Sequence, residues 1–169
     1  MEYCHQVALR QAWAALRHPS HADWLLHACG WRRIDALAAL APHYAEPLDA
    51  AEVLSLLDAA LQGGQPLALD VDQAGERQHY HGSVERLSVS DGQWVFRLGR
   101  HWLHLAEAQI DSAWIVHTPA RHALASSVEL FDSRGRPLLT LRDAHEPGQR
   151  DACHWRLQLA ALARTPLAA

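Results

Sequence analysis

Apolar residues recur every three or four positions from about residue 6 to residue 62, and this spacing predicts helices. The stretches VALRQAWAAL and DAAEVLSLLDAAL show the period best, and both are rich in alanine and leucine, which favour helix. Asp49 is placed to cap the helix of the second stretch, and Gly63-Gly64 predicts its end. The earlier part is divided into short helices at Pro19-Ser20, Gly30 and Pro42.

Near Pro66 the period changes to two and remains so to about Arg142, which predicts a run of antiparallel strands. A turn at 73–75 would join PLALDVD to RQHYHGS, and Asp91-Gly92 would join VERLSVS to QWVFRLG. HWLHLA, IDSAWIVHT and a strand pair within SSVELFDSRGRPLLTLR follow. Such alternation predicts that one sheet face is buried, while the other is wet or covers a ligand.

After Pro147-Gly148 the segment DACHWRLQLAALAR returns to helical spacing and places Trp155, Leu159 and Leu162 on one stripe. The expected fold class is therefore α+β, with N-terminal helices, a large antiparallel meander sheet and a closing C-terminal helix. We expect a helical N-terminal region over 1–64 and the sheet with its closing helix over 65–169. Both would form one compact domain, given the length of 169 residues.

The charge is nearly balanced, because 15 basic residues, all of them arginine, stand against 19 acidic ones. This balance lacks the basic field that nucleic acids select, so we expect no nucleic-acid partner. No apolar run approaches the roughly 20 residues that span a bilayer, so we expect no membrane partner. The three cysteines show no CxxC spacing and no basic-then-apolar leader begins the chain, which favours the reducing cytoplasm.

The segment QHYHGSV carries two histidines, His79 and His81, which share one strand face with Arg77. Imidazole is a common metal ligand, and a polar residue on the wet side of a strand is the other interpretation that the residues allow. No glycine-rich phosphate loop precedes a helix, and no GxSxG or HExxH motif occurs. Nucleotide binding and the common hydrolase sites therefore gain no support.

Four motifs follow one another over roughly residues 66–163: YHGSVERLSVSDGQW, HWLHLAEAQIDSAWIV, SSVELFDSRGRPLLTL and, after a gap, EPGQRDACHWRLQLAAL. In this order they resemble the HemS/ChuX family of bacterial haem-utilisation proteins. The preceding part matches only in its helical character. The resemblance implies cytoplasmic haem binding and delivery. It also implies a C₂ homodimer, because a short member resembles half of a long one that carries two repeats.

In the long members the axial ligand is the histidine of an Ile-His-Ser/Thr-Gly segment, and aligning QHYHGSV with it places His81 at that position. The resemblance thus implies that His81 holds the haem iron. His79 is the second candidate, and His104 matches the family's Leu-His-Leu histidine. The aromatic residues expected to wall the ring are Trp94, Phe96, Trp102 and Trp114. The cations expected near the propionates are Arg77, Arg86, Arg97 and Arg100.

Two segments depart from the family pattern and remove cations. VHTPA at 116–120 replaces Val-Arg-Lys-Pro-Thr, and LRDAHE at 141–146 replaces Phe-Phe-Gly-Lys-Arg. Two functions therefore stay open: a haem-binding carrier, and a non-enzymatic relative that keeps the fold and dimer but binds another ligand or none. A haem-degrading enzyme is third, because oxygen activation would require a tuned distal pocket that the sequence does not reveal.

Overall fold

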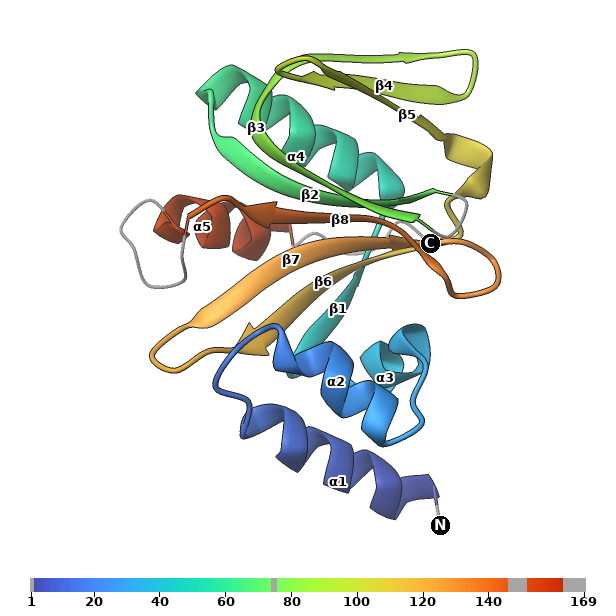
Figure 1. The fold of residues 1–169 in the computed structure, drawn as a ribbon, viewed down its shortest axis with the longest axis vertical. Helices are drawn as coiled ribbons and strands as arrows, with labels where there is room; N and C mark the ends of the chain where they lie inside the picture. Colours follow the sequence, from blue (N-terminus) through green and yellow to red (C-terminus); the bar gives the residue numbers. More distant parts are fainter. Residues whose placement is uncertain (1, 74–75, 146–151, 163–169) are drawn as a thin grey trace.

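The computed structural model describes residues 2–73, 76–145 and 152–162, and within them a large sheet lies between two groups of helices (Figure 1). The helices are α1 (Glu2–Ala14), α2 (His21–Ala28), α3 (Arg33–Leu40), α4 (Ala50–Gly63) and α5 (Ala152–Leu162), with one 3₁₀ turn, η1 (Glu107–Gln109). The strands are β1 (Ala45–Leu48), β2 (Pro66–Gln73), β3 (Glu76–Ser90), β4 (Gln93–Leu98), β5 (His101–Ala106), β6 (Ser112–Pro119), β7 (Leu124–Phe131) and β8 (Pro137–Asp143).

The strands form one antiparallel sheet in the order β1-β6-β7-β8-β2-β3-β4-β5. The α+β prediction is confirmed, since helices precede a large antiparallel sheet and a helix follows it. The sheet consists of two meanders, β2 to β5 and β6 to β8. Pairing of β8 with β2 joins them into one surface.

Strand β1 lies inside the segment whose spacing predicted only helices, so that part of the prediction is wrong. Its four residues pair with β6 at the sheet edge, where Ala45 lies opposite Val116. Pro47 is compatible with this position because an edge strand tolerates a missing N–H. So short a strand gives too few positions for a period of two to be recognised between helices.

Helix α4 begins and ends where the sequence predicts. The side chain of Asp49 accepts a hydrogen bond from the backbone N–H of Ala51 at 3.0 Å, and the side chain of Glu52 accepts one from the N–H of Asp49 at 3.1 Å. Gly64 follows in the left-handed conformation with φ of 61°, which favours glycine. Both ends of the helix are thus satisfied locally.

Hydrophobic side chains form a core on each face of the sheet. The larger core lies against α4 and α5 and includes Leu57, Trp94, Phe96, Trp155 and Leu159. The smaller core lies between α1 to α3 and the strands β1, β6 and β7, and includes Trp13, Leu37, Val116 and Phe131. Helices α1 to α3 thus cover only one end of their sheet face, while within the described ranges no helix lies on the β4 and β5 end of the same face (Figure 1).

Strand β3 pairs with β2 along its first half and with β4 along its second, and its pairing with β4 contains a register shift between Val84 and Arg86. Before the shift the even positions face the larger core, as Val84 does; after it the odd positions do, as Leu87 does. An extra residue in one strand has this effect because side chains alternate between faces. The odd positions from 77 to 81 therefore point away from the larger core.

Candidate functional site

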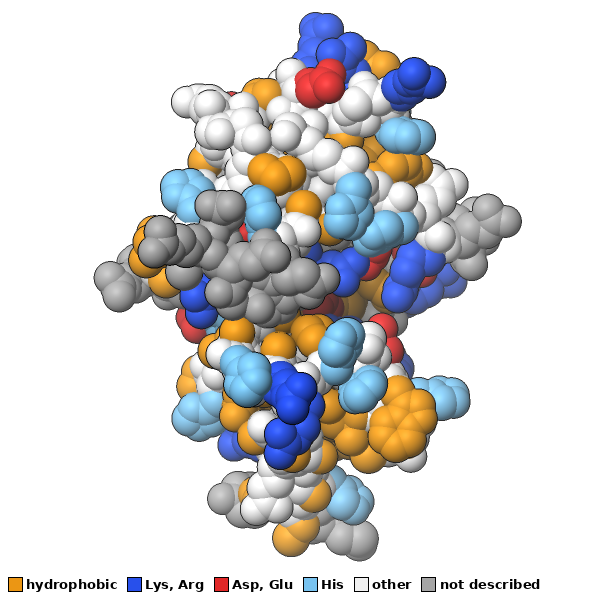
Figure 2. Space-filling model, turned by 60° about the vertical axis from the view of Figure 1, so that its left-hand side comes forward, with side chains coloured by type: hydrophobic (Ala, Val, Ile, Leu, Met, Phe, Trp, Pro, Cys, Tyr) orange, Lys and Arg blue, Asp and Glu red, His pale blue; other side chains and the backbone are white. Residues whose placement is uncertain are grey.

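A cavity of about 540 Å³ lies between α2 and the sheet face that is opposite the larger core. Strands β7, β8, β2 and β3 form its floor, α2 and α3 with the segment before α2 form its other wall, and α5 adds Trp155 and Arg156. Figure 2 shows the hollow with histidines on both sides and charged side chains within it. Its volume lies in the range of roughly 300–1,000 Å³ that is usual for small-molecule pockets.

The cross-strand register brings the polar residues of the floor together. One row across β7, β8, β2 and β3 consists of Glu129, Thr140, Asp70 and His79. The neighbouring row consists of Ser127, Arg142, Ala68 and His81. Directly opposite residues have Cβ atoms about 4.5–5.5 Å apart, so side chains from distant parts of the sequence become direct neighbours.

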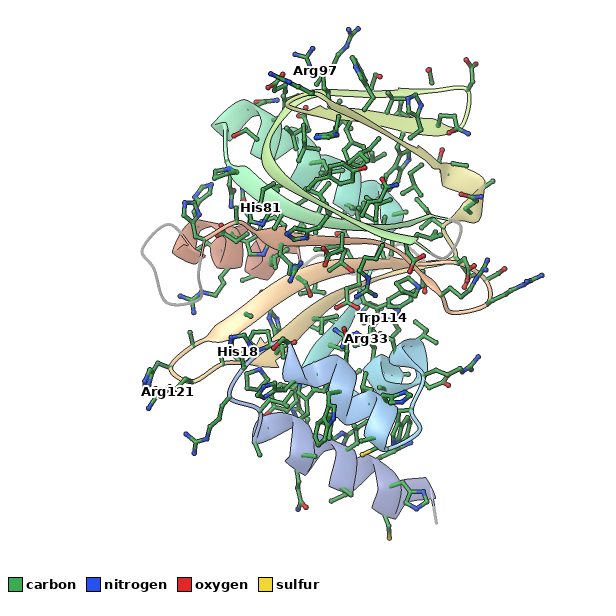
Figure 3. The ribbon with its side chains drawn as sticks, in the orientation of Figure 1. His18, Arg33, His81, Arg97, Trp114 and Arg121 are labelled. Atoms are coloured by element: carbon green, nitrogen blue, oxygen red, sulfur yellow. The ribbon has the colours of Figure 1, made fainter. Side chains whose placement is uncertain are left out.

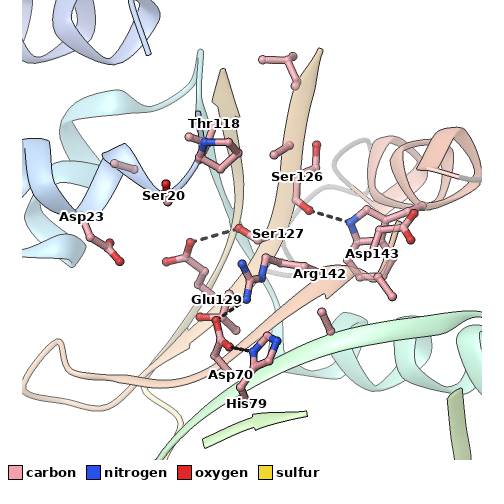
Figure 4. Close-up of a pocket in the computed structure, with 18 of the residues that line it drawn as sticks. Ser20, Asp23, Asp70, His79, Thr118, Ser126, Ser127, Glu129, Arg142 and Asp143 are labelled. Atoms are coloured by element: carbon pink, nitrogen blue, oxygen red, sulfur yellow. Dashed lines mark hydrogen bonds and ion pairs between the residues drawn. The ribbon is translucent and has the colours of Figure 1, made fainter. Parts of the chain in front are cut away.

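Asp70 is the centre of a hydrogen-bonded group on this floor (Figure 4). One of its carboxylate oxygens accepts a hydrogen bond from Nη2 of Arg142 at 2.5 Å, and the other accepts one from Nδ1 of His79. A histidine that donates from Nδ1 keeps its lone pair on Nε2, which is the form that binds metals. Asp70 therefore orients His79 and fixes its tautomer.

His81 has different surroundings, although its ring centroid lies only 4.8 Å from that of His79. Its side chain is exposed, and its ring nitrogens have no hydrogen-bonding partner in the part of the chain that the structure describes. His18, from the segment between α1 and α2, lines the wall across the cavity from His81 (Figure 3). Both nitrogens of His81 are thus available to a ligand.

Glu129 is a buried carboxylate of the floor, with 3% of its surface exposed. Nε and Nη2 of Arg33 donate to its two oxygens at 3.0 and 2.6 Å, and Oγ of Ser127 donates to Oε1 at 3.2 Å. Burial lowers the pKa of Arg33, but the charge and hydrogen bonds of Glu129 and the charge of Asp23 outweigh it and raise the pKa above its ordinary value. Arg33 therefore stays charged, and its two hydrogen bonds to Glu129 join α3 to β7.

Asp23 of α2 lies between two arginines of the cavity. Its Oδ1 accepts a hydrogen bond from Nη1 of Arg33 at 3.3 Å, and its Oδ2 lies 3.8 Å from Nη1 of Arg77. The side chains of Asp23 and Arg77 are 69% and 55% exposed. Since α2 and β3 belong to opposite walls, the pair of Asp23 and Arg77 spans the cavity on its solvent-exposed side.

Of the site residues predicted from the sequence, the structure brings Arg77, His79 and His81 to the cavity. Trp94 and Phe96 do not line it, because the alternation of β4 turns both into the larger core. Trp114 is on the helix-covered face but packs beside the smaller core. The apolar part of the lining comes instead from Pro19, Ala22, Ala68, Leu124, Ala125, Pro137, Ala144 and Trp155.

The other predicted residues lie on β3, β4 and β5, on the sheet face that faces away from α4 and that none of the described helices covers at this end. They are Arg86, Arg97, Trp102 and His104, with Arg100 exposed in the turn between β4 and β5. The guanidinium carbon of Arg97 is 5.6 Å from the ring centroid of Trp102, and Nη2 donates to Glu85 at 2.5 Å. Figure 3 shows Arg97 well away from His81, near the top of the view on β4, the strand next to β3.

Sequence reasoning missed Asp70, Glu129, Arg33 and Asp23. A signal for Asp70 was present, because the predicted hairpin of β2 and β3 pairs residues symmetrically about its turn. The predicted strand ends, at 72 and 77, pair with each other in such a hairpin and place Asp70 opposite His79, as the register has it. Glu129 and Arg33 come from distant elements, so only the packing of α3 on the sheet could show their contact.

Within the three described ranges, no three or more histidine, cysteine, aspartate or glutamate side chains gather as they would around a metal ion. The helices of these ranges also include none that has the length and apolar character to cross a membrane.

Comparison with known proteins relates the chain to one family. A family model described as "Haemin-degrading HemS.ChuX domain" matches residues 30–162. The chain is 27% identical over 158 residues to the hemin transport protein HmuS of Yersinia pestis, and 26% identical over 163 residues to the hemin transport protein HemS of Yersinia enterocolitica. These matches cover 93% and 96% of this chain but 46% and 47% of the relatives, so it spans about half of their length.

Solved structures agree with this relationship. Apo-PhuS, a heme-binding protein from Pseudomonas aeruginosa, superposes with a TM-score of 0.84 and 31% identity, over 93% of this chain and 46% of that one. ChuS, a heme degrading enzyme of Escherichia coli O157:H7, gives 0.86 and 25%, over 93% and 47%. ChuX, with 0.70 and 11% identity, shares the fold. Since the family model covers most of the chain and the motifs occur in the family's order, this chain belongs to the HemS/ChuX family.

Proposed function

We propose that the chain binds haem in the cavity between α2 and the sheet, and that a histidine of β3 holds the iron. The observation that carries the proposal is the pair His79 and His81, which lie side by side on the cavity face of β3. Imidazole nitrogen is a common protein ligand of haem iron. Membership of a family whose relatives include hemin transport and heme-binding proteins supports the same ligand.

The cavity has the two further features that a haem requires. Four arginines line the cavity, and three of them, Arg33, Arg77 and Arg142, could pair with propionates. Leu124, Trp155 and the small apolar residues of the lining offer contact to the ring. The lost family cations are thus partly replaced by arginines from other positions, one of them Arg142 within the altered segment itself.

For the iron ligand we propose His81, the position that the resemblance implies, because its nitrogens are available. His79 is the alternative, and one observation favours it. Its Nδ1 donates to Asp70, and metal-binding histidines usually donate their second nitrogen to a carboxylate or carbonyl. Separate substitution of each residue decides between them.

Haemin titration of the purified chain, followed by its Soret band, tests the proposal. Wild type should give a saturable band at low micromolar haemin, and His81→Ala should weaken binding by at least about tenfold and shift the band. His104→Ala is the matched control, because it removes an exposed histidine outside the cavity. If His79→Ala alone has the effect, His79 is the ligand. A wild type that gives no saturable band contradicts haem binding itself.

The haemin complex also distinguishes the carrier from two other candidate functions. The relatives named for heme degradation favour an oxidative enzyme as the next candidate after the carrier. Adding a reductant and oxygen should leave the Soret band of a carrier in place, whereas degradation would remove it. A relative that binds another ligand or none would show no band at the start.

We also propose that two copies form a C₂ dimer, since the chain matches one half of its longer relatives. Exposed Trp24, Trp102 and Leu157 are apolar side chains that an interface could cover. Light scattering after size-exclusion chromatography should give twice the monomer mass. A cytoplasmic location is likewise proposed, and cell fractionation checks it.

A further inference from the structure

We propose that Asp23 occupies a carboxylate-binding subsite of the cavity, and that a carboxylate of the ligand, a haem propionate, replaces it there. The inference rests on the proposed haem binding. It adds that this chain carries its own competitor for the ligand's acidic groups. The contacts of Asp23 with Arg33 and Arg77 define the subsite.

Three carboxylates of the cavity pair with its arginines, and they differ in how firmly they are held. Glu129 accepts two hydrogen bonds from Arg33 and is nearly fully buried. Asp70 accepts from Arg142 at 2.5 Å and also from His79, with 19% of its side chain exposed. Asp23 makes only longer contacts, of 3.3 and 3.8 Å, and is 69% exposed.

These differences decide which carboxylate can leave. Exposed ion pairs contribute little because water and salt screen them, whereas breaking a buried pair leaves an uncompensated charge. Asp23 can turn into water and be solvated, while Glu129 has no such alternative. Asp23 is therefore the exchangeable carboxylate of the three.

The vacated position would suit a ligand carboxylate for the same reasons that it suits Asp23. Arg33 comes from α3 and Arg77 from β3, so two guanidinium groups approach one carboxylate from opposite walls of the cavity. Arg33 stays charged beside Glu129, which continues to orient it from the other side. A propionate bound here would join the two walls, and its ring would extend over the floor toward His79 and His81.

Asp23→Asn removes the competitor and keeps the size of the side chain. Haemin should bind the variant about two- to fivefold more tightly at low salt, and the gain should shrink as salt is added. Arg77→Gln should weaken haemin binding and reduce the gain from Asp23→Asn. Asp35→Asn is the matched control, because this half-exposed aspartate of α3 pairs with Arg32 but does not line the cavity.

Haemin dimethyl ester, which lacks carboxylates, supplies the second probe. Its affinity should be the same for wild type and Asp23→Asn. The subsite is wrong if wild type binds haemin saturably and Asp23→Asn binds it equally or more weakly. It is also wrong if the ester gains as much as haemin. Failure of wild type and variant to bind either porphyrin would instead overturn the proposed haem function, and the subsite with it.

Discussion

Two groups of similar side chains on one face of the sheet have different environments. We call Arg77, His79 and His81 the cavity cluster, and Arg97, Trp102 and His104 the outer cluster. Both combine imidazole with guanidinium, and the sequence alone assigned both to one ligand site. In the structure helices α2 and α3 stand opposite the cavity cluster, whereas none of the helices that the structure describes covers the outer cluster (Figure 1).

The comparison shows that the same residue types form a cavity only where helices such as α2 and α3 pack opposite them. Curvature of the sheet carries β4 and β5 away from α1 to α3, so the outer cluster faces solvent. In the cavity cluster the same residue types meet Asp70 and Asp23, which fix or pair them. The side chains of Arg77 and His79 remain 55% and 53% exposed, so the facing helices and these carboxylates, and not burial, distinguish the cavity cluster.

Two arginine–glutamate pairs, one buried beside the cavity and one exposed in the outer cluster, should differ most in their contribution to stability. Glu129→Gln should destabilise the fold by about 3 kcal/mol, because Arg33 is left without its buried partner. Glu85→Gln, which breaks the exposed pair with Arg97, should cost at most about 1 kcal/mol. The side chains of Arg33 and Glu129 are 19% and 4% exposed, whereas those of Arg97 and Glu85 are 41% and 43% exposed. Urea unfolding measures both, and equal losses would contradict the contrast.

Two tryptophans allow a smaller comparison. Nε1 of Trp155 donates a hydrogen bond to the backbone oxygen of Ser126 at 2.9 Å within the core. Trp155→Phe leaves that acceptor unpaired and should lower the free energy of unfolding by about 1–3 kcal/mol. Trp102 is 48% exposed, so Trp102→Phe should cost less than about 1 kcal/mol. Thermal unfolding of both variants is the measurement. A loss for Trp102→Phe as large as that for Trp155→Phe would mean that the outer cluster is covered in solution.

A pH effect distinguishes a partly buried histidine from an exposed one. Burial lowers the pKa of His117, although the charge of Glu46 acts in the opposite direction. Below the ordinary histidine pKa of about 6.5 the unfolded chain binds a proton that folded His117 does not, so stability falls as the pH drops. His117→Asn should reduce that fall between pH 7 and 5. Chemical denaturation at several pH values measures the slope, and an unchanged slope for His117→Asn would argue against the assignment.

The smallest expected effect concerns the outer cluster alone. Arg97→Gln removes the cation that stands over the ring of Trp102. Such a contact at an exposed site contributes about 0.5–1 kcal/mol, and salt screens the accompanying pair with Glu85. Urea unfolding at low and high salt should show a small loss that shrinks with salt. Haemin binding should not change, since Arg97 lies outside the cavity.

Local patterns were sufficient for much of the fold. Helix α4 begins after Asp49 and ends before Gly64 as expected, since capping depends on residues within one turn. The alternation of Trp94, Phe96 and Leu98 into the core was also readable, because strand faces have a period of two. The bulge in β3 could not be predicted from the alternation. Two predicted strands form the single strand β3, and the bulge within it turns Arg86 away from the core.

The sequence by itself determined most element types, the family motifs and the shared face of Arg77, His79 and His81, because all of these depend on short-range spacing. The four-residue strand β1 was the exception among the element types. Only the tertiary structure decided which of the predicted residues surround a cavity. That selection follows from the packing of α1 to α3 on one end of the sheet and from the register of β7, β8, β2 and β3. Contacts such as Arg33 with Glu129 join residues far apart in the chain, and local spacing carries no information about them.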